Sequence, residues 1–132
     1  MVLAIDDDPA VRQALRQLGA AERIDLIDCA DTAAAHQVLR REQVDVVLAD
    51  QELAPGDATG LQLLSELGGA HRAIYRIIAT VRTDDDFLVQ AINRGQIDAV
   101  LPKPWTPEGL VALLRQGIDA ARLRRHNLHL AD

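Results

Sequence analysis

Aromatic residues are almost absent from this chain, whose 132 residues include one Phe, one Tyr and one Trp. The core must therefore be built mainly from Leu, Ile, Val and Ala. Cysteine is as scarce, and the single Cys29 can form no internal disulfide, which fits a reducing cytoplasm. No apolar run is long enough to span a membrane, and the N-terminus has no signal-peptide pattern. We therefore expect a cytoplasmic protein that does not enter a membrane.

Positive charge is scarce relative to negative charge, with 14 Lys and Arg residues, 20 Asp and Glu residues and a net charge of −6. This balance argues against binding nucleic acid or an anionic membrane through the surface as a whole. The basic stretch RLRRH, residues 122–126, is better explained as cations at the C-terminal end of a helix. The chain length predicts one domain.

Short apolar segments alternate with helical patterns five times along the chain. The predicted strands are residues 2–5, 24–29, 44–49, 74–79 and 97–101, and the predicted helices are residues 9–19, 32–41, 61–67, 83–94 and 107 to beyond 121. This alternation predicts an α/β fold, a doubly wound parallel sheet with helices on both faces. The third strand, VDVVLA, is largely β-branched, which indicates burial on both faces.

Residues that can cap helices mark several of these helix starts. Asp8, followed by a proline, predicts the N-cap of the first helix, and Gly19 predicts its end. Thr83 predicts the cap of the fourth helix, with Asp86 three residues further on as a variant of the capping box. Thr106, again followed by a proline, predicts the cap of the last helix.

Polar side chains collect where the predicted strands end. Asp6 and Asp7 follow the first strand, Asp50 the third, Thr80 the fourth, and Lys103 lies just past the fifth. Ligands of open α/β sheets bind outside the carboxyl ends of the strands. If the first strand is central and next to the third, the three carboxylates converge on one crevice.

Three carboxylates in one crevice need a cation, because two of them about 4 Å apart repel each other by roughly 4 kcal/mol near a protein surface. Oxygen ligands without His or Cys suit Mg²⁺. A lysine and a hydroxyl beside such a cluster predict a site for a phosphoryl group. One carboxylate then serves as the nucleophile, since an aspartate can form an acyl phosphate.

The chain resembles the receiver domain of bacterial response regulators over nearly all of its length. The resemblance rests on the segments IDDDP, VDVVLAD, GLQLL, IIAT and AINRGQIDAVLPKPW, which occur in this order. It implies a flavodoxin-like sheet with strand order 2-1-3-4-5. It also implies a phosphorylation switch of a two-component or phosphorelay system, which catalyses its own modification and is not an enzyme acting on an external substrate.

The resemblance also implies roles for the residues at the strand ends. Asp50 would be the phosphoacceptor, Asp7 a direct Mg²⁺ ligand, Asp6 a ligand through water, the backbone carbonyl of Glu52 a further metal ligand, Thr80 a donor to a phosphoryl oxygen, and Lys103 a partner of the phosphoryl group and of Asp50. The Lys103–Pro104 peptide is expected to be cis.

The resemblance extends to domain organisation and partners. Residues 1–121 would form the receiver domain, and residues 122–132 a helical extension or linker stub. The expected partners are a histidine kinase or histidine phosphotransfer protein and an output module beyond the C-terminus. The apolar spacing of the last helix also suggests a homodimer contact. We expect this domain to bind neither nucleic acid nor a membrane.

Two other functions stay open at this point. IDDDPA loosely resembles the Asp-x-Asp motif of haloacid-dehalogenase-type phosphatases, in which Asp6 would be the nucleophile. A receiver-like interaction module that is never phosphorylated is the second alternative. Three positions bear on whether the domain is phosphorylated and switches. Val81 lies where the family pattern has a small residue, and Val100 where it has an aromatic residue. Glu52 lies where side chains affect the lifetime of the phosphoryl group.

Overall fold

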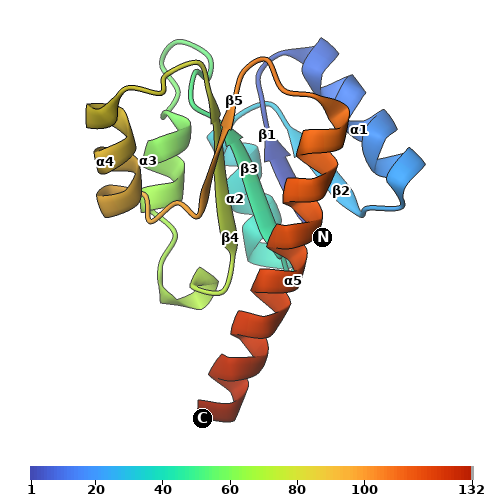
Figure 1. Ribbon diagram of the computed structural model, residues 1–132, viewed down its shortest axis with the longest axis vertical. Helices are drawn as coiled ribbons and strands as arrows, with labels where there is room; N and C mark the ends of the chain where they lie inside the picture. The colour runs from blue at the N-terminus through green and yellow to red at the C-terminus, as the bar shows by residue number, and fades with distance from the viewer. Residues whose placement is uncertain (132) are drawn as a thin grey trace.

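Five parallel strands form one sheet in the order β2-β1-β3-β4-β5 in the computed structural model, which describes residues 1–131 and side chains through residue 129 (Figure 1). Residue 132, the end of the predicted extension, lies outside the described residues. The predicted α/β fold and strand order are confirmed. The strands are β1 (Val2–Ile5), β2 (Leu26–Cys29), β3 (Val46–Asp50), β4 (Tyr75–Thr80) and β5 (Ala99–Pro102).

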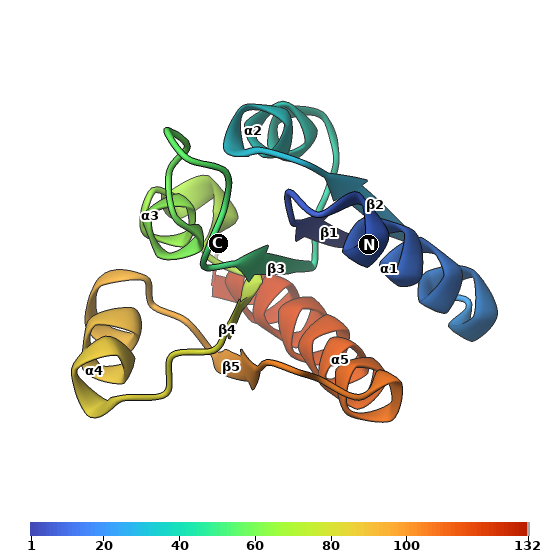
Figure 2. The ribbon, with the colours of Figure 1, turned by 90° about the horizontal axis from the view of Figure 1, so that it is seen from above.

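Helices cover both faces of this sheet (Figure 2). Helices α1 and α5 pack on one face, and α2, α3 and α4 pack on the other. A short 3-10 turn, η1 (Gly69–His71), precedes β4. The α-helices are α1 (Pro9–Glu22), α2 (Thr32–Arg41), α3 (Gly60–Ser65), α4 (Asp85–Arg94) and α5 (Pro107–Ala131).

The central strand β3 is buried along its whole length, as its apolar sequence predicts. Its side chains alternate between two cores, because successive residues of a strand point to opposite faces. Val47 packs with Leu63 and Phe87 on the side of α2, α3 and α4. Val46 packs with Leu114 on the side of α1 and α5. This double burial holds the carboxyl end of β3 in place at the centre of the sheet.

Helix α1 runs past its predicted end at Gly19, so that prediction was wrong. The helix ends at Glu22, and Arg23 follows in the left-handed conformation with φ of 56°. A Cβ at Gly19 would lie 3.1 Å from the carbonyl oxygen of Ile24 and 3.3 Å from Cβ of Leu26. The glycine therefore permits close packing against the chain that enters β2. The end of α1 and the turn at Arg23 use the residues just before β2, so β2 begins at Leu26 and not at residue 24.

Two predicted helix caps are confirmed. The carboxylate of Asp8 accepts a hydrogen bond from the backbone N–H of Ala10 at 2.9 Å. The hydroxyl of Thr106 accepts one from the backbone N–H of Gly109 at 3.1 Å. Each satisfies a donor that has no partner within its helix.

The predicted cap of α4 was wrong, because Asp84 and not Thr83 holds this position. The Asp84 carboxylate accepts from the backbone N–H of Phe87 at 3.2 Å and also pairs with Arg82. A carboxylate is a charged acceptor that the positive end of a helix favours, so it displaces the neighbouring hydroxyl as the cap. The proposed capping pair of Thr83 and Asp86 does not form.

The strands β3, β4 and β5 end later than their apolar patterns predict. Asp50 pairs with Ala79, and Thr80 pairs with Pro102. The ends of the strands are set by backbone pairing, which continues past the last apolar residue into polar residues. Asp50 and Thr80 are therefore the last residues of strands, which restrains their backbones. Helix α3, in contrast, begins and ends earlier than the predicted residues 61–67.

Helix α5 continues without a break past the predicted boundary at residue 121. Its last turns extend beyond the edge of the sheet opposite the carboxyl ends of the strands (Figure 1). Arg124 pairs with Asp98 at 2.7 Å, and Arg125 pairs with Asp45 at 2.9 Å. These ion pairs connect the extension to the sheet. Within the described residues, no helix combines the length and the apolar character needed to cross a membrane.

Candidate functional site

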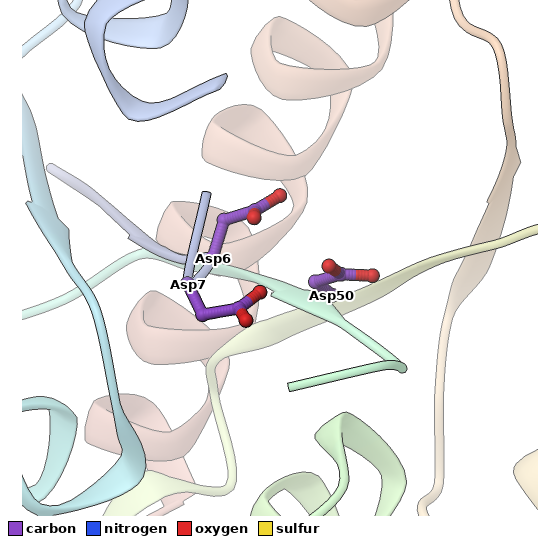
Figure 3. Close-up of side chains that lie close together, drawn as sticks. All are labelled: Asp6, Asp7 and Asp50. Carbon is purple, nitrogen blue, oxygen red and sulfur yellow. The ribbon is translucent and has the colours of Figure 1, made fainter. Parts of the chain in front are cut away.

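Asp6, Asp7 and Asp50 meet at the carboxyl end of the sheet (Figure 3). One carboxylate oxygen from each residue lies within 4.8 Å of the other two. Asp6 and Asp7 follow β1, Asp50 ends β3, and these strands are neighbours. Asp6 and Asp50 are buried, whereas Asp7 is exposed. The three predicted acids therefore form one cluster of hard oxygen ligands, of the kind that suits Mg²⁺.

Neighbouring groups hold Asp6 in its place. Its carboxylate accepts from the backbone N–H of Asp8 at 2.9 Å, and its backbone carbonyl accepts from the guanidinium of Arg12 at 2.7 Å. Burial raises the pKa of Asp6; the charges of Asp50 and Asp7 act in the same direction, and the hydrogen bond from Asp8 acts against them. The ionised form of Asp6 is therefore costly even though the charge of Lys103 favours it.

Lys103 supplies a positive charge at the cluster. Its Nζ donates to Oδ1 of Asp50 at 2.5 Å, and its backbone N–H donates to the carbonyl of Thr80 at 3.0 Å. Burial alone would lower the pKa of Lys103, but the hydrogen bond and the attraction of Asp50 outweigh it, and the pKa is raised. The lysine therefore stays charged beside the acids. The Lys103–Pro104 peptide is cis, as expected.

Thr80 ends β4 and is fully buried. Its hydroxyl oxygen accepts from the backbone N–H of Arg82 at 2.9 Å. A hydroxyl can accept and donate at once, so its proton stays available to an incoming oxygen. Val81 follows, and its side chain is 66 % exposed at the surface.

Asp50 has two inequivalent carboxylate oxygens. Oδ1 accepts from Lys103 and from the backbone N–H of Glu52 at 3.3 Å. Within the described part of the chain no donor reaches Oδ2. One oxygen is thus oriented by two donors, while the other is available to react or to bind a metal. The side chain of Glu52 is exposed.

An open hollow of about 320 Å³ lies beside the cluster. Asp6 and Lys103 line its polar side, and Val11, Pro104 and Trp105 line its apolar side. The hollow therefore opens beside Asp6 and Lys103, between α1 and the connection from β5 to α5.

Comparison with known families agrees with this geometry. The response regulator receiver domain family matches residues 2–115. The chain belongs to this family. Receiver domains are signalling domains, so the arrangement of acids, lysine and hydroxyl belongs to a signalling module.

The curated relatives of this receiver domain are larger transcriptional regulators. It is 34% identical over 132 residues to the hydrogenase transcriptional regulatory protein HoxA of Cupriavidus necator, covering 98% of this chain and 27% of HoxA. It is 32% identical over 118 residues to the transcriptional regulatory protein KdpE of Mycobacterium tuberculosis, covering 89% of this chain and 50% of KdpE. The chain thus spans about a quarter to a half of these relatives.

Solved receiver domains have the same fold. The signal receiver domain of an HD domain-containing protein from Pseudomonas fluorescens Pf-5 superimposes with a TM-score of 0.84 at 30% identity, covering 95% of this chain and 90% of that one. A CheY-like receiver domain protein from Methanospirillum hungatei gives a TM-score of 0.82 at 22% identity, covering 93% and 96%. The second likeness concerns the fold alone.

Two residues of this receiver domain lie around the site without having been predicted. Arg12 contacts the Asp6 carbonyl, and Asp57 fastens the segment after β3 to Thr32. The only signal for Arg12 is its place one helical turn after the cap at Asp8. Asp57 and Thr32 are 25 residues apart, and no local pattern connects them.

Proposed function

We propose that this receiver domain accepts a phosphoryl group on Asp50 from a histidine kinase or a histidine phosphotransfer protein, in a reaction that depends on Mg²⁺. The observation that carries the proposal is the contact of Lys103 with Asp50 beside the carboxylates of Asp6 and Asp7. The family match supports this function over the phosphatase function, in which Asp6 would be the nucleophile.

The transfer follows from the two oxygens of Asp50. Oδ2 attacks the phosphorus, an oxygen–phosphorus bond forms, and the bond from phosphorus to the donor breaks with its electron pair going to the donor. Lys103 stays within reach to neutralise negative charge on the product. Thr80 donates its hydroxyl proton to a phosphoryl oxygen at the edge of the site. No external substrate is turned over.

The acid cluster fits a resident Mg²⁺. Among the described residues no donor occupies the exposed Asp7 carboxylate, which suits a direct ligand. The Asp6 carboxylate already accepts from the backbone of Asp8, which suits contact through water. The backbone carbonyl of Glu52, next but one to Asp50, would complete the set. When bound, the ion neutralises charge on the phosphoryl oxygens.

The partners follow from the relatives and from α5. The relatives are transcriptional regulators, and this chain spans only a part of their length, which supports an output module. Residues 1–121 would then form the receiver domain, and residues 122–132 would lead toward that module. A homodimer contact stays a prediction, supported by Leu123, which is 61 % exposed on the extension. Light scattering measures the molar mass of the protein and of Leu123→Glu. A dimer that the substitution disrupts supports the contact, and a monomer in both cases contradicts it.

Phosphotransfer from a kinase also fits a cytoplasmic location.

Mass spectrometry tests the phosphoacceptor. Incubated with acetyl phosphate and Mg²⁺, the wild-type protein should gain the mass of one phosphoryl group, and peptide mapping should place it on Asp50. Asp50→Asn should gain none, because an amide does not form the acyl phosphate. Asp25→Asn, which changes an exposed acid away from the site, should label like the wild type.

Each alternative gives a different result in the same experiment. Labelling of Asp6, with Asp50→Asn labelled like the wild type, would support the phosphatase function. A folded wild-type protein that binds Mg²⁺ and gains no phosphoryl group would support the unphosphorylated interaction module.

A further inference from the structure

The segment that joins β3 to α3, residues 51–59, carries Glu52 and is here named the β3–α3 loop. Both ends of this loop are fixed next to Asp50. The backbone N–H of Gly60 donates to the Gln51 carbonyl at 3.3 Å, and the Leu61 N–H donates to the Gln51 side chain at 2.9 Å. A Cβ at Gly60 would lie 2.4 Å from the Asp50 carbonyl oxygen, so only glycine permits this approach.

The middle of the loop depends on a single polar attachment. Leu53 packs against the core, and the Asp57 N–H donates to the Ala54 carbonyl at 3.0 Å, which closes a turn around Gly56 with its φ of 87°. Within the described chain, most hydrogen bonds of residues 52–59 stay inside the loop or reach β3 or α3, which the loop joins. Only the two bonds between Thr32 and Asp57 reach another element, α2.

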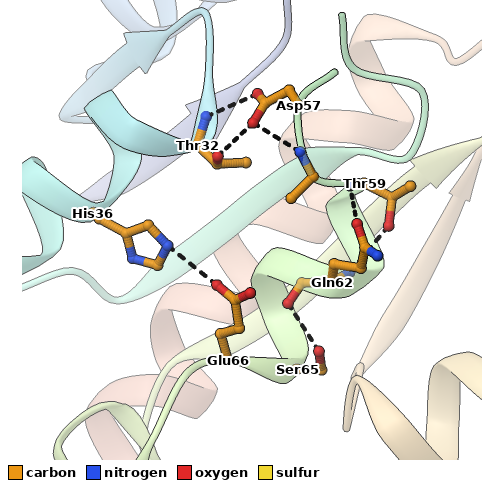
Figure 4. Close-up of polar contacts among 8 residues, drawn as sticks. Thr32, His36, Asp57, Thr59, Gln62, Ser65 and Glu66 are labelled. Atoms are coloured by element: carbon orange, nitrogen blue, oxygen red, sulfur yellow. Dashed lines mark hydrogen bonds and ion pairs between the residues drawn. The ribbon is translucent and has the colours of Figure 1, made fainter. Parts of the chain in front are cut away.

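The Asp57 carboxylate is bound at the N-terminus of α2 (Figure 4). Its Oδ1 accepts from the Thr32 hydroxyl at 2.5 Å and from the Ala58 N–H at 2.8 Å, and its Oδ2 accepts from the Thr32 N–H at 3.1 Å. The hydrogen bond from the Thr32 hydroxyl lowers the pKa of Asp57, so the charged form is favoured. Thr32 begins α2, where the helix end attracts a carboxylate.

These contacts exclude a direct metal role for Asp57, because both of its oxygens are engaged away from the acid cluster. We infer that Asp57 is a positioning residue for the metal site, whose bond to Thr32 keeps the Glu52 part of the β3–α3 loop beside Asp50. The inference rests on the proposed function, in which the Glu52 carbonyl completes the metal site. A ligand on an untied loop would have to be ordered at each binding event, which weakens affinity.

A second contact of α2, with the chain that follows α3, provides a matched control. His36 of α2 lies 3.3 Å from the carboxylate of Glu66, which follows α3 (Figure 4). This pair also bridges α2 and the α3 region, but it lies outside the β3–α3 loop. Glu66→Gln therefore weakens this contact and removes one negative charge, but it leaves the attachment of the β3–α3 loop, and so the position of Glu52, unchanged.

The experiment measures Mg²⁺ affinity by calorimetry and backbone amide exchange of the loop without Mg²⁺. Thr32→Val keeps the charge of Asp57 and removes the hydroxyl, and we expect it to weaken Mg²⁺ binding about threefold. Asp57→Ala should weaken it roughly tenfold. Asp57→Asn, which keeps an acceptor oxygen, should recover part of this loss, and Glu66→Gln should bind like the wild type. Amides of Asp57, Gly60 and Leu61 should exchange faster in Thr32→Val.

The variants separate attachment from charge. If Thr32→Val binds Mg²⁺ like the wild type, or if its loop amides exchange at the wild-type rate, the inference is overturned. Equal weakening by Asp57→Asn and Asp57→Ala, with Thr32→Val unchanged, would mean that charge alone matters, which also overturns it. Absence of Mg²⁺ binding by the wild type would instead contradict the metal site of the proposed function.

Discussion

Three consecutive aspartates have three different tasks in this protein. The side chain of Asp8 caps α1. Asp6 is buried, and its carboxylate accepts a hydrogen bond from the backbone N–H of Asp8. Asp7 is exposed at the cluster. Capping removes one charge from the crevice, which reduces the repulsion there. The three residues are of the same type, so their different roles come from the burial of each side chain and from the backbone N–H groups with which Asp6 and Asp8 form hydrogen bonds.

Cys29 shows how burial controls the chemistry of a single group. It ends β2 and is 8% exposed, and its burial, with the charges of Asp31 and Asp28 adding to it, raises its pKa to about 12. At pH 8 the thiolate is then on the order of one part in ten thousand. We expect the native protein to react with a thiol reagent at least tenfold more slowly than the urea-unfolded chain, as followed by absorbance. Equal rates in the two states would contradict this burial.

Arg76 joins three elements from the inside of the protein. It lies on β4, is 5% exposed, and donates to the carbonyls of Leu64, Leu67 and Gly95 at 2.9, 3.4 and 3.3 Å. Leu64 lies in the last turn of α3, and Gly95 caps the end of α4. A cation is favoured at such helix ends, where carbonyls lack partners. Desolvation by burial lowers the pKa of Arg76, although the guanidinium remains charged.

Replacement of this arginine should therefore affect the ends of two helices together. We expect Arg76→Met to lower the free energy of unfolding by about 2–3 kcal/mol, because it leaves buried carbonyls without donors. Arg72→Met, at an exposed position nearby in the sequence, should change it by less than about 0.5 kcal/mol. Urea unfolding measures both. A loss below that of Arg72→Met would show that the three carbonyls do not need the guanidinium.

The charged groups at the two ends of the sheet are arranged differently. The carboxyl ends of the strands hold the acid cluster, and the opposite edge is joined to α5 by Arg124 and Arg125. The acid cluster and the last turns of α5 therefore lie at opposite ends of the sheet, with β3, β4 and the earlier turns of α5 between them (Figure 1). Stability at the acid end should then depend on a bound cation.

We predict that Mg²⁺ stabilises the folded state through Asp7. At ten times its dissociation constant it should raise the free energy of unfolding by about 1.4 kcal/mol. Asp7→Asn should lose most of this gain, and without Mg²⁺ it should be at least as stable as the wild type because one repulsive charge is gone. Asp8→Asn should keep the gain, since asparagine also caps helices. Urea unfolding at matched ionic strength measures these differences, and the reverse ranking of the two variants would contradict the division of roles.

The sequence alone determined the alternation of strands and helices, and its resemblance to receiver domains implied the strand order of the fold. An apolar run of β-branched residues is typical of a strand that is buried on both faces, and parallel strands bring their carboxyl ends to one edge. The convergence of Asp6, Asp7 and Asp50 could therefore be predicted before any contact was known. The same argument placed Thr80 and Lys103 at that edge.

Only the tertiary structure decided the contacts that support this cluster. The bond of Asp57 to Thr32 and the contacts of Arg76 connect elements far apart in the chain, and they depend on loop conformation and on how closely helices approach the sheet. The end of α1 was mispredicted for the same reason, since Gly19 meets the chain entering β2. Hydrophobic periodicity says which face of an element is buried, but it does not say which polar group of a distant segment lies opposite.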